Sequence, residues 1–372
     1  MNVSPRRTAT ALLAAALVVA GQWLGPLSAS GQPAGTPVPA NGPVPGSGPV
    51  PVSGPVPVIY DSDMDFDDAS TLALLCEEHK LGRIDLRAVT VANNGFGEPH
   101  RALTHARSVL TQCGLPRVPT ADGSTGAGVH PAPPELVTTI ETVLTGALDD
   151  ADQPTPPSRW TAAQLIALAA GTAPGRVVVL ATGPLTNVAD ALASGRVRER
   201  IARIHVMGGA LAVPGNLYGS ALPGFDNSQE FNMWMDPASA QRVLTRARPG
   251  SVRLVPLDAT RFVPITPDFV SRLGAEQNAP GARIAYRIAS QPDLAALIGL
   301  GIMYWWDALA AVSLVHGGIV TGSRTVPVSI VQTGEQSGRT VTTRPGVPIR
   351  AAIEADRAAF EEIFLDSLNG RR

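Results

Sequence analysis

Residues 58–79 read VIYDSDMDFDDASTLALLCEEH. The segment begins with a short apolar run, Val58–Tyr60, and ends with a helix-spaced apolar pattern over Ala69–His79. Between them, residues 61–68 contain five aspartates. Because a buried strand, a loop and a helix form the repeating unit of α/β proteins, the segment predicts one such unit, with an acidic loop at the carboxyl end of its strand.

The same alternation continues outward along the chain. The predicted strands are Val58–Tyr60, Leu86–Val91, Val177–Ala181, Ile204–Met207 and Val252–Leu257. The predicted helices between them are Ala69–His79, Pro99–Gln112, Ala162–Ala170 and Leu185–Ala193. We therefore expect an α/β fold with a mostly parallel twisted sheet and helices on both faces.

The end of the chain departs from this alternation. Two apolar runs, Val326–Ile330 and Arg339–Thr343, flank a glycine-containing turn at residues 334–338, which predicts a β-hairpin. A helix-spaced pattern over Ala351–Leu368 then predicts a closing helix. Residues 58–370 are therefore expected to form one folded domain.

The first 57 residues differ from this domain in composition and sequence pattern. Residues 1–30 resemble a signal peptide, with Arg6 and Arg7 before the apolar run Ala9–Ala20, which is shorter than the roughly 20 residues of a membrane span. Residues 31–57 repeat Gly-Pro-Val-Pro, which is typical of a disordered, semi-extended linker. We expect an exported protein that is secreted or held at the cell surface or in the periplasm.

Composition excludes several classes of protein. The chain has 29 Lys and Arg residues against 31 Asp and Glu, so no basic surplus is available for binding nucleic acid. Two cysteines, Cys76 and Cys113, are too few for a disulfide framework or a four-thiolate zinc site. Sequence spacing does not give their distance, so a disulfide between them stays open. The oligomeric state is also open, a homo-oligomer included.

Polar residues follow the predicted strands at the point where each strand ends. Asn93 and Asn94 follow the second strand, residues 182–187 follow the third, and Asn216 comes shortly after the fourth. Because the carboxyl ends of parallel strands meet at one edge of a sheet, we expect these side chains to line a single ligand crevice.

The five clustered aspartates indicate a metal site. A solvated acidic loop is the simpler interpretation, but unpaired charge is costly between a buried strand and an apolar helix, and a hard cation such as Ca²⁺ or Mg²⁺ would compensate for it. An EF-hand loop starting at Asp61 would need Gly at its sixth position and Glu at its twelfth, where Phe66 and Leu72 stand. A phosphatase of the haloacid-dehalogenase type fits poorly, because the single lysine, Lys80, lies in the first predicted helix.

The pattern Asp-x-Asp-x-x-x-Asp-Asp at 61–68 resembles the N-terminal signature of the nucleoside hydrolases, which are calcium-dependent N-ribohydrolases. Further segments resemble the same family in the same order along the chain. They are Val91–Asn94, Ala181–Asn187, Met207–Asn216, Glu230–Asn232, Asp236-Pro237, Pro256–Thr260 and Trp306–Ala310. The resemblance extends over residues 58–370 and implies a Rossmann-like core and an enzyme that splits small-molecule nucleosides into free base and ribose.

The resemblance also implies a role for individual residues. The implied Ca²⁺ ligands are Asp63, Asp68, Asp307 and the backbone carbonyl of Thr182. The implied catalytic residues are Asp63 as general base, Asn94 near the attacking water and Trp306 beside the leaving base. The implied substrate-binding residues are Asp67, Asn94, Met207, Asn216, Glu230, Asn232 and Trp306. Asp61 is expected to anchor the loop rather than to contact substrate.

Trp306 bears on the choice of base. Broad-specificity members of the family have a histidine directly before the late metal-binding aspartate, whereas Trp306 resembles the purine-specific members, in which an indole stacks on the base. A core aromatic beside the metal is the alternative interpretation of Trp306. A purine preference, serving purine salvage, is therefore expected.

The chain departs from the family pattern at two places. Met64-Asp65 stands where Pro-Gly is usual, and residues 119–143 lack the family's His-Gly-x-x-Gly-Leu pattern, with only His130 nearby. These departures leave two alternatives to nucleoside hydrolysis. One is hydrolysis of another N- or O-riboside at the same site, and the other is a non-catalytic calcium- or sugar-binding surface protein.

Overall fold

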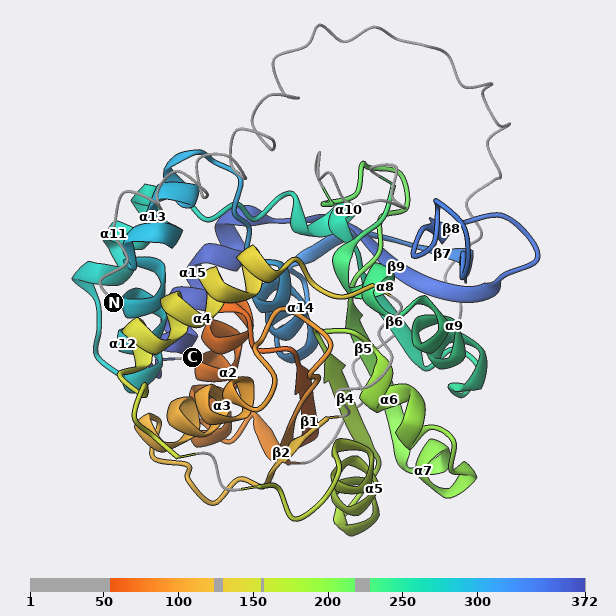
Figure 1. Ribbon diagram of the computed structural model, residues 1–372, viewed down its shortest axis with the longest axis horizontal. Coiled ribbons are helices and arrows are strands. Elements are labelled where there is room, and N and C mark those ends of the chain that lie inside the picture. The colour runs from red at the N-terminus through yellow and green to blue at the C-terminus, as the bar shows by residue number, and fades with distance from the viewer. Residues whose placement is uncertain (1–53, 124–129, 155–156, 218–227, 372) are drawn as a thin grey trace, which may run out of the picture.

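The computed structural model describes residues 54–123, 130–154, 157–217 and 228–371 (Figure 1). The predicted signal peptide at 1–30 and the predicted linker up to residue 53 lie outside these described residues. The strand that opens the domain begins at Val56, two residues before the predicted boundary of the linker.

The described residues form one nine-stranded sheet with the order β3-β2-β1-β4-β5-β6-β9-β7-β8. The strands are β1 (Val56–Ser62), β2 (Ile84–Val91), β3 (Thr120–Asp122), β4 (Val177–Ala181), β5 (Ile201–Met207), β6 (Val252–Val255), β7 (Val320–Ile330), β8 (Thr340–Val341) and β9 (Val347–Ala355). In this spatial order, all neighbouring strands from β3 to β9 pair in parallel. The last two strands differ, because β7 is antiparallel to β9 and β8 is antiparallel to β7. The predicted α/β class with a mostly parallel sheet is confirmed.

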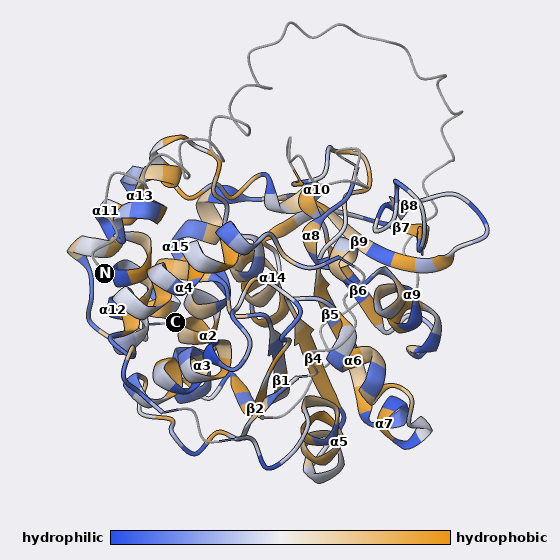
Figure 2. Ribbon diagram, viewed as in Figure 1, coloured by the Kyte–Doolittle hydropathy of each residue, from blue (hydrophilic) through white to orange (hydrophobic). Residues whose placement is uncertain are grey.

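Helices cover both faces of the sheet, so each face has its own apolar core (Figures 1 and 2). On one face lie α2 (Phe66–Lys80), α3 (Arg101–Gln112), α4 (Pro134–Leu148), α11 (Pro267–Ala275), α12 (Pro280–Ala289), α13 (Pro292–Gly299), α14 (Trp306–Val315) and α15 (Arg357–Leu368). On the other lie α5 (Ala162–Thr172), α6 (Thr186–Ala191), α7 (Gly195–Arg200) and α9 (Pro237–Arg246). Two short helices, α8 (Phe231–Met235) and α10 (Leu257–Thr260), follow the sheet's carboxyl edge.

The strand order reverses direction between β1 and β4. From β1 the chain builds outward through β2 and β3, and it then returns to β4 beside β1 before continuing to β5 and β6. In a doubly wound sheet this reversal opens a crevice at the carboxyl ends of the two central strands. The acidic loop follows β1 at this point, and Thr182 follows β4.

The C-terminal prediction was wrong in one element. Residues 351–355, predicted as the start of the closing helix, belong to β9, and the helix α15 begins at Arg357 after Asp356 caps it. Pairing with β6 on one side and β7 on the other overrides the helix propensity of this alanine-rich stretch. The predicted hairpin does form between β7 and β8, but β8 is limited to Thr340–Val341 and β9 is the main partner of β7.

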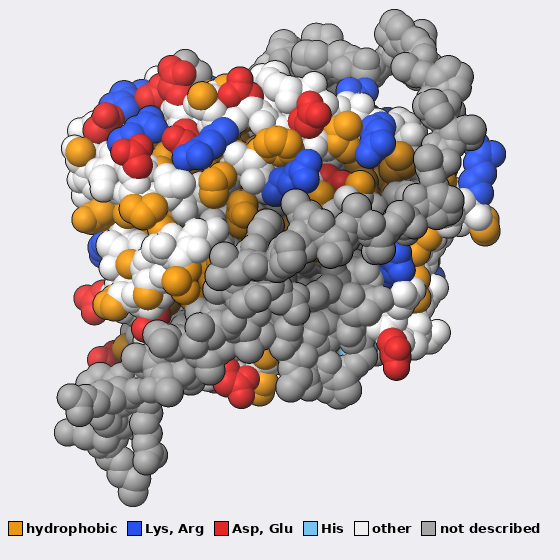
Figure 3. Space-filling model, turned by 90° about the horizontal axis from the view of Figure 1, so that it is seen from above, with side chains coloured by type: hydrophobic (Ala, Val, Ile, Leu, Met, Phe, Trp, Pro, Cys, Tyr) orange, Lys and Arg blue, Asp and Glu red, His pale blue; other side chains and the backbone are white. Residues whose placement is uncertain are grey.

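Other predictions about the chain had mixed outcomes. Strand β6 ends at Val255 rather than at Leu257, which instead begins α10. Cys76 and Cys113 are both free and buried in the structure. None of the described helices is both long enough and apolar enough to cross a bilayer. On the face shown in Figure 3, acidic and basic side chains are interspersed with apolar ones.

A buried charge cluster joins α3 to α4 and to the loop that follows it. The His105 ring bonds Asp150 through Nδ1 at 2.9 Å and Glu141 through Nε2 at 2.8 Å, and Arg101 contacts both carboxylates. Burial alone would lower the pKa of His105, but the hydrogen bonds and charges of these two acids outweigh burial and raise it. Burial would also raise the pKa of Glu141. The hydrogen bond from His105 and other contacts outweigh burial and lower this pKa to about 2.

We predict that His105→Gln destabilises the fold by about 2 kcal/mol at slightly acidic pH, because it removes the nearer of the two cationic partners of the buried Asp150 and leaves only Arg101 at 3.3 Å. A raised histidine pKa contributes stability in full below the unfolded value of 6.5 and loses it as the pH rises through the folded value. The destabilisation measured by urea unfolding should therefore be larger at about pH 5.5 than at about pH 9.

His100→Gln is the control, because the His100 side chain is 71% exposed beside Asp122 and should change stability by less than about 0.5 kcal/mol. An equal loss at both pH values in His105→Gln would contradict the charged role of His105.

Candidate functional site

The acidic loop makes a tight turn between β1 and α2. Met64 is fully buried with φ of 56°, a left-handed conformation that costs a residue with a side chain about 1–2 kcal/mol. Asp65 then caps α2, because its Oδ1 accepts the backbone N–H groups of Asp67 at 3.0 Å and Asp68 at 3.2 Å. This arrangement places three carboxylates at the first turn of a helix, where the helix dipole favours negative charge.

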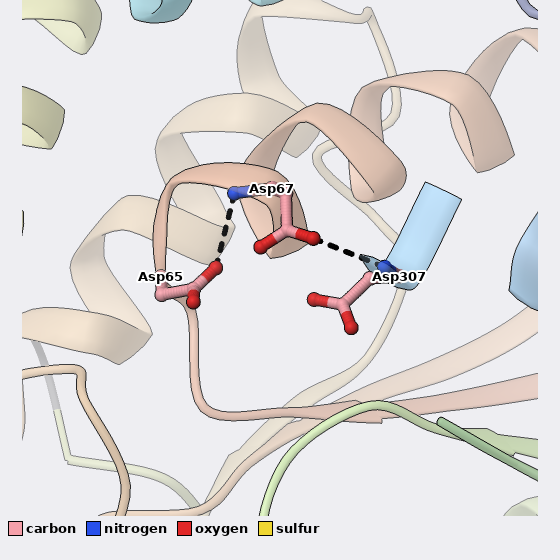
Figure 4. Close-up of side chains that lie close together, drawn as sticks. All are labelled: Asp65, Asp67 and Asp307. Atoms are coloured by element: carbon pink, nitrogen blue, oxygen red, sulfur yellow. Dashed lines mark hydrogen bonds between the residues drawn. The ribbon is translucent and has the colours of Figure 1, made fainter. Parts of the chain in front are cut away.

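Carboxylates from two distant segments meet at this turn (Figure 4). One carboxylate oxygen from each of Asp65, Asp67 and Asp307 lies within 4.8 Å of the others. Asp307 comes from the start of α14, and its backbone N–H donates to Asp67 Oδ2 at 3.0 Å. Asp67 and Asp307 are predicted site residues that the structure brings together. Asp65 was missed, although its position between two predicted ligands was the available signal.

The charges in this group lack a positive partner. Burial, followed by the charges of neighbouring aspartates, raises the pKa of Asp63, Asp67 and Asp307 well above the usual range. The same causes raise the pKa of Asp65 to about 6. No lysine or arginine among the described residues forms an ion pair with these carboxylates. Several buried oxygen donors with unbalanced negative charge suit a hard divalent cation, so the residues present fit a metal site.

Asp63, the predicted general base, is held tightly beside this group. Its Oδ2 accepts the backbone N–H of Phe96 at 2.7 Å, and the residue is 2% exposed. Gly95, Gly97 and Gly183 pack against it so closely that a Cβ on any of them would lie 2.0–2.7 Å from an Asp63 atom. Glycine at these three positions therefore permits the loops after β1, β2 and β4 to converge on Asp63.

Asp68 and Thr182 belong to one hydrogen-bonded chain. Asp68 Oδ1 accepts the hydroxyls of Tyr60 at 2.8 Å and Thr182 at 2.6 Å. The Thr182 carbonyl accepts Asn232 Nδ2 at 2.7 Å, and the same amide lies 3.4 Å from the Met207 carbonyl. The predicted residues at the ends of β4 and β5 are thus brought together with Asp68. Metal coordination by Asp63, Asp68 and Thr182 stays a prediction.

Asp61 and Asn94 both bond side chains at the start of α6. Asp61 Oδ1 accepts Thr90 Oγ1 at 2.5 Å and Asn187 Nδ2 at 2.9 Å, which fits its expected anchoring role. Asn94 Nδ2 donates to Thr186 Oγ1 at 2.8 Å. The Asn94 Oδ1 is buried and has no partner among the described residues, so this acceptor is available to a bound molecule.

The predicted ribose-binding residues hold the backbone around α8. Glu230 Oε2 accepts the N–H of Gly209 at 2.9 Å, and its Oε1 accepts the N–H of Asn232 at 2.9 Å. Asn216 Oδ1 accepts the N–H of Phe231 at 3.0 Å. These contacts fix the segment after β5 against α8, and sugar binding by the same side chains stays a prediction.

Two sets of aromatic side chains adjoin the crevice. Trp306 is half-buried and lies 6.1 Å from Phe66 and 5.7 Å from Tyr304, measured between ring centroids, whereas its neighbour Trp305 is a buried core residue. Half-burial leaves part of the Trp306 indole accessible, as stacking on a base requires.

The second aromatic set lies over the loop after β2. Phe96 and Phe231 pack edge to face with centroids 4.6 Å apart, and Phe231 also contacts Trp234, which stacks on His130. Phe96 follows the glycine beside Asp63, and Phe231 separates the predicted sugar-binding residues Glu230 and Asn232. Neither phenylalanine was predicted as a site residue, because an isolated aromatic in a loop carries no spacing signal.

Comparison with known proteins relates this chain to nucleoside hydrolases. A family model described as inosine-uridine preferring nucleoside hydrolase matches residues 58–362. The pyrimidine-specific ribonucleoside hydrolase RihA of Klebsiella pneumoniae is 32% identical over 216 residues, which are 57% of this chain and 63% of that protein. The protein of the same name from Citrobacter koseri is 31% identical over 224 residues, 59% of this chain and 66% of that one. The chain thus matches less than two thirds of the length of these curated relatives.

Solved structures share the fold over a greater length. An inosine-uridine preferring nucleoside hydrolase from Bacillus anthracis superposes with a TM-score of 0.71 at 21% identity, covering 85% of this chain and 99% of that one. A purine-preferring ribonucleoside hydrolase from Gardnerella vaginalis gives a TM-score of 0.64 at 21% identity, covering 85% of this chain and 98% of that one.

We predict that Asp65→Asn weakens Ca²⁺ binding by about tenfold or more, because it removes one of three clustered negative charges. Asparagine caps helices as well as aspartate does, so α2 should stay folded. The measurement is isothermal titration calorimetry with Ca²⁺.

Asp190→Asn, which neutralises a side chain that is 53% exposed on α6, is the matched control and should leave the affinity unchanged. Equal affinities for the wild type and Asp65→Asn would show that Asp65 takes no part in cation binding.

Proposed function

Because the chain belongs to the family of inosine-uridine preferring nucleoside hydrolases, we propose that it hydrolyses the N-glycosidic bond of ribonucleosides to give a free base and ribose. The observation that carries this proposal is the group of half-buried Asp65 and buried Asp67 and Asp307 at the point where the strand order of the sheet reverses. The group provides the negative charge that glycosidic cleavage calls for, because the sugar passes through an oxocarbenium-like transition state.

Ca²⁺ is the proposed cofactor. Asp63, Asp68, Asp307 and the Thr182 carbonyl would hold it, with Asp65 as a further carboxylate of the same group. When bound, such a cation supplies positive charge that orients sugar hydroxyls and makes a water easier to deprotonate. The support for calcium is the set of buried oxygen donors without a basic partner.

Asp63 is the proposed general base. A carboxylate that accepts the proton of the attacking water must be fixed and ionised, and the Phe96 N–H bonded to Asp63 Oδ2 favours both conditions. Water adds its oxygen to the anomeric carbon, its proton passes to Asp63, and the bond to the base nitrogen breaks with the electron pair leaving on the base. The unpartnered Asn94 Oδ1 is the proposed acceptor that orients this water or a sugar hydroxyl.

The sugar and base would occupy the two sides of the crevice. Asp67, Asn216, Glu230 and Asn232 are the proposed ribose-binding residues, with Met207 lining the floor at the end of β5. Trp306 is the proposed stacking partner of the base, and we propose a preference for purines on this ground. The accessible part of the half-buried indole supports the stacking role.

We further propose that the protein is exported and serves purine salvage outside the cytoplasm. The support is the sequence pattern at residues 1–30, in which two arginines precede a short apolar run.

One observation favours a second candidate function, hydrolysis of another N- or O-riboside. Asp65 adds a carboxylate where the family has glycine, and Phe96 and Phe231 form an aromatic surface beside Asp63. Both features alter the surroundings of the bond to be broken without removing the proposed base.

The test of the proposed activity is release of reducing sugar from inosine, adenosine, guanosine, uridine and cytidine by the full chain. We expect turnover that EDTA abolishes and added Ca²⁺ restores. Asp63→Ala should lower kcat by about 10²–10⁴-fold, because a general base contributes on this scale. Asp190→Ala is the control and should keep full activity.

If no reducing sugar is released from any of the five nucleosides while Ca²⁺ still binds, nucleoside hydrolysis is rejected. Hydrolysis of another riboside, or a binding protein without activity, would then be favoured. Turnover that survives both EDTA and Asp63→Ala would reject the mechanism.

We predict that Trp306→Ala lowers kcat/KM for inosine and guanosine by about 10–100-fold, the value of one lost base-stacking contact. The loss for uridine should be smaller, because a pyrimidine offers less area for stacking. Trp160→Ala, which removes a half-buried indole at the start of α5, is the control. An equal loss for purines and pyrimidines would identify Trp306 as a packing residue.

A further inference from the structure

Three arginines lie in a row across adjacent strands, away from the carboxylates. Arg203 is on β5, Arg253 on β6 and Arg350 on β9. Arg253 is the register partner of Arg350 on one side and of His205 on the other, and Arg203 precedes His205 by two residues. Side chains two residues apart on a strand share a face, so all three arginines are on the same face of the sheet.

This face is the one that carries α14. The His205 ring bonds Ser313 of α14 at 3.0 Å, which fixes the direction in which it and the arginines point. The residues that alternate with the arginines, among them Ile204, Leu254 and Ala351, are buried in the core on the opposite face. Arg203 and Arg253 are near the amino ends of their strands, whereas the carboxylate group follows the carboxyl ends.

The guanidinium groups of this row have no acidic partner. Among the described residues, the side chains of Arg203 and Arg350 form no hydrogen bond or ion pair. The Arg253 side chain bonds only the carbonyls of Gly250 at 2.7 Å and Val252 at 3.1 Å. Arg200, which directly precedes β5, differs from these arginines because its side chain donates three hydrogen bonds to backbone carbonyls. The row therefore keeps most of its donors unused.

The three positive charges also act on one another. Burial and then the charge of Arg350 lower the pKa of Arg203, and burial and then the other two arginines lower the pKa of Arg253. Burial and the charges of Arg203 and Arg253 lower the pKa of His205 to about 3, so its ring is neutral and adds no charge. Arg203 and Arg253 are half-buried, whereas Arg350 is exposed. Neighbouring like charges without a counterion are unfavourable, and an anion would relieve them.

We propose that Arg203, Arg253 and Arg350 form a binding site for a phosphate group. The planar guanidinium offers a fork of donors that matches phosphate oxygens, and several arginines around one site suit a doubly charged anion better than a carboxylate. The site is separate from the proposed catalytic crevice and takes either free phosphate or the phosphate of a larger molecule.

The test is calorimetric titration of the full chain at low salt with inorganic phosphate and, separately, with adenosine 5′-monophosphate. The double variant Arg203→Gln/Arg253→Gln should raise the Kd for inorganic phosphate by at least about tenfold. Arg324→Gln is the matched control, because Arg324 on β7 pairs with Ala351 and points from the opposite face. It removes one positive charge, against two in the double variant, and should change the Kd by less than about twofold.

The outcomes separate the sources of the phosphate. Binding of both probes that the double variant weakens supports a general phosphate site. Tighter binding of the nucleotide that the double variant also weakens assigns the site to the phosphate of a larger molecule, whereas nucleotide binding that the double variant leaves unchanged would place the nucleotide elsewhere and count against the proposal. Absence of binding for both probes, or an equal loss in Arg324→Gln, would overturn the proposal. Thermal unfolding of each variant verifies that the fold persists, and none of these readouts depends on hydrolase activity.

Discussion

Repulsion between buried carboxylates is the constraint on which this molecule depends. Five carboxylates lie close together in a poorly solvated site, those of Asp63, Asp65, Asp67, Asp68 and Asp307. Burial raises the pKa of Asp63, Asp65, Asp67 and Asp307. Two helices begin there, α2 and α14, so their dipoles offset part of the negative charge. Backbone N–H groups offset more, at Asp63 through Phe96 and at Asp67 through Asp307. A divalent cation would complete the compensation.

The same constraint organises the strands around the crevice. Asp68 accepts the Thr182 hydroxyl, the Thr182 carbonyl accepts the Asn232 amide, and Glu230 accepts the Asn232 N–H and that of Gly209. This chain of contacts runs from the first turn of α2 through the end of β4 to α8 and the segment after β5, so the position of the Asp68 carboxylate is coupled to that of Glu230. A hydrogen-bonded chain of this kind loses more than one contact when any member is removed.

The sequence was most informative where local signals and tertiary structure agree. The apolar runs predicted β1, β2, β4, β5 and the start of β6, and their polar ends predicted the crevice. The alanine-rich segment 351–355 was mispredicted because partners far apart in sequence, β6 and β7, decide its conformation. Asp65 was missed because a helix cap and a site carboxylate look alike in sequence. Phe96 and Phe231 were missed because only the fold brings them together.

The glycines around Asp63 have a consequence for how this protein can diverge. Gly95, Gly97 and Gly183 each lack room for a single carbon, so any replacement there would push the proposed base out of place. Exposed glycines such as Gly175 and Gly299 meet no atom within 4 Å and are free to vary. Sequence drift in descendants of this chain should therefore spare these three codons while altering those of the exposed glycines.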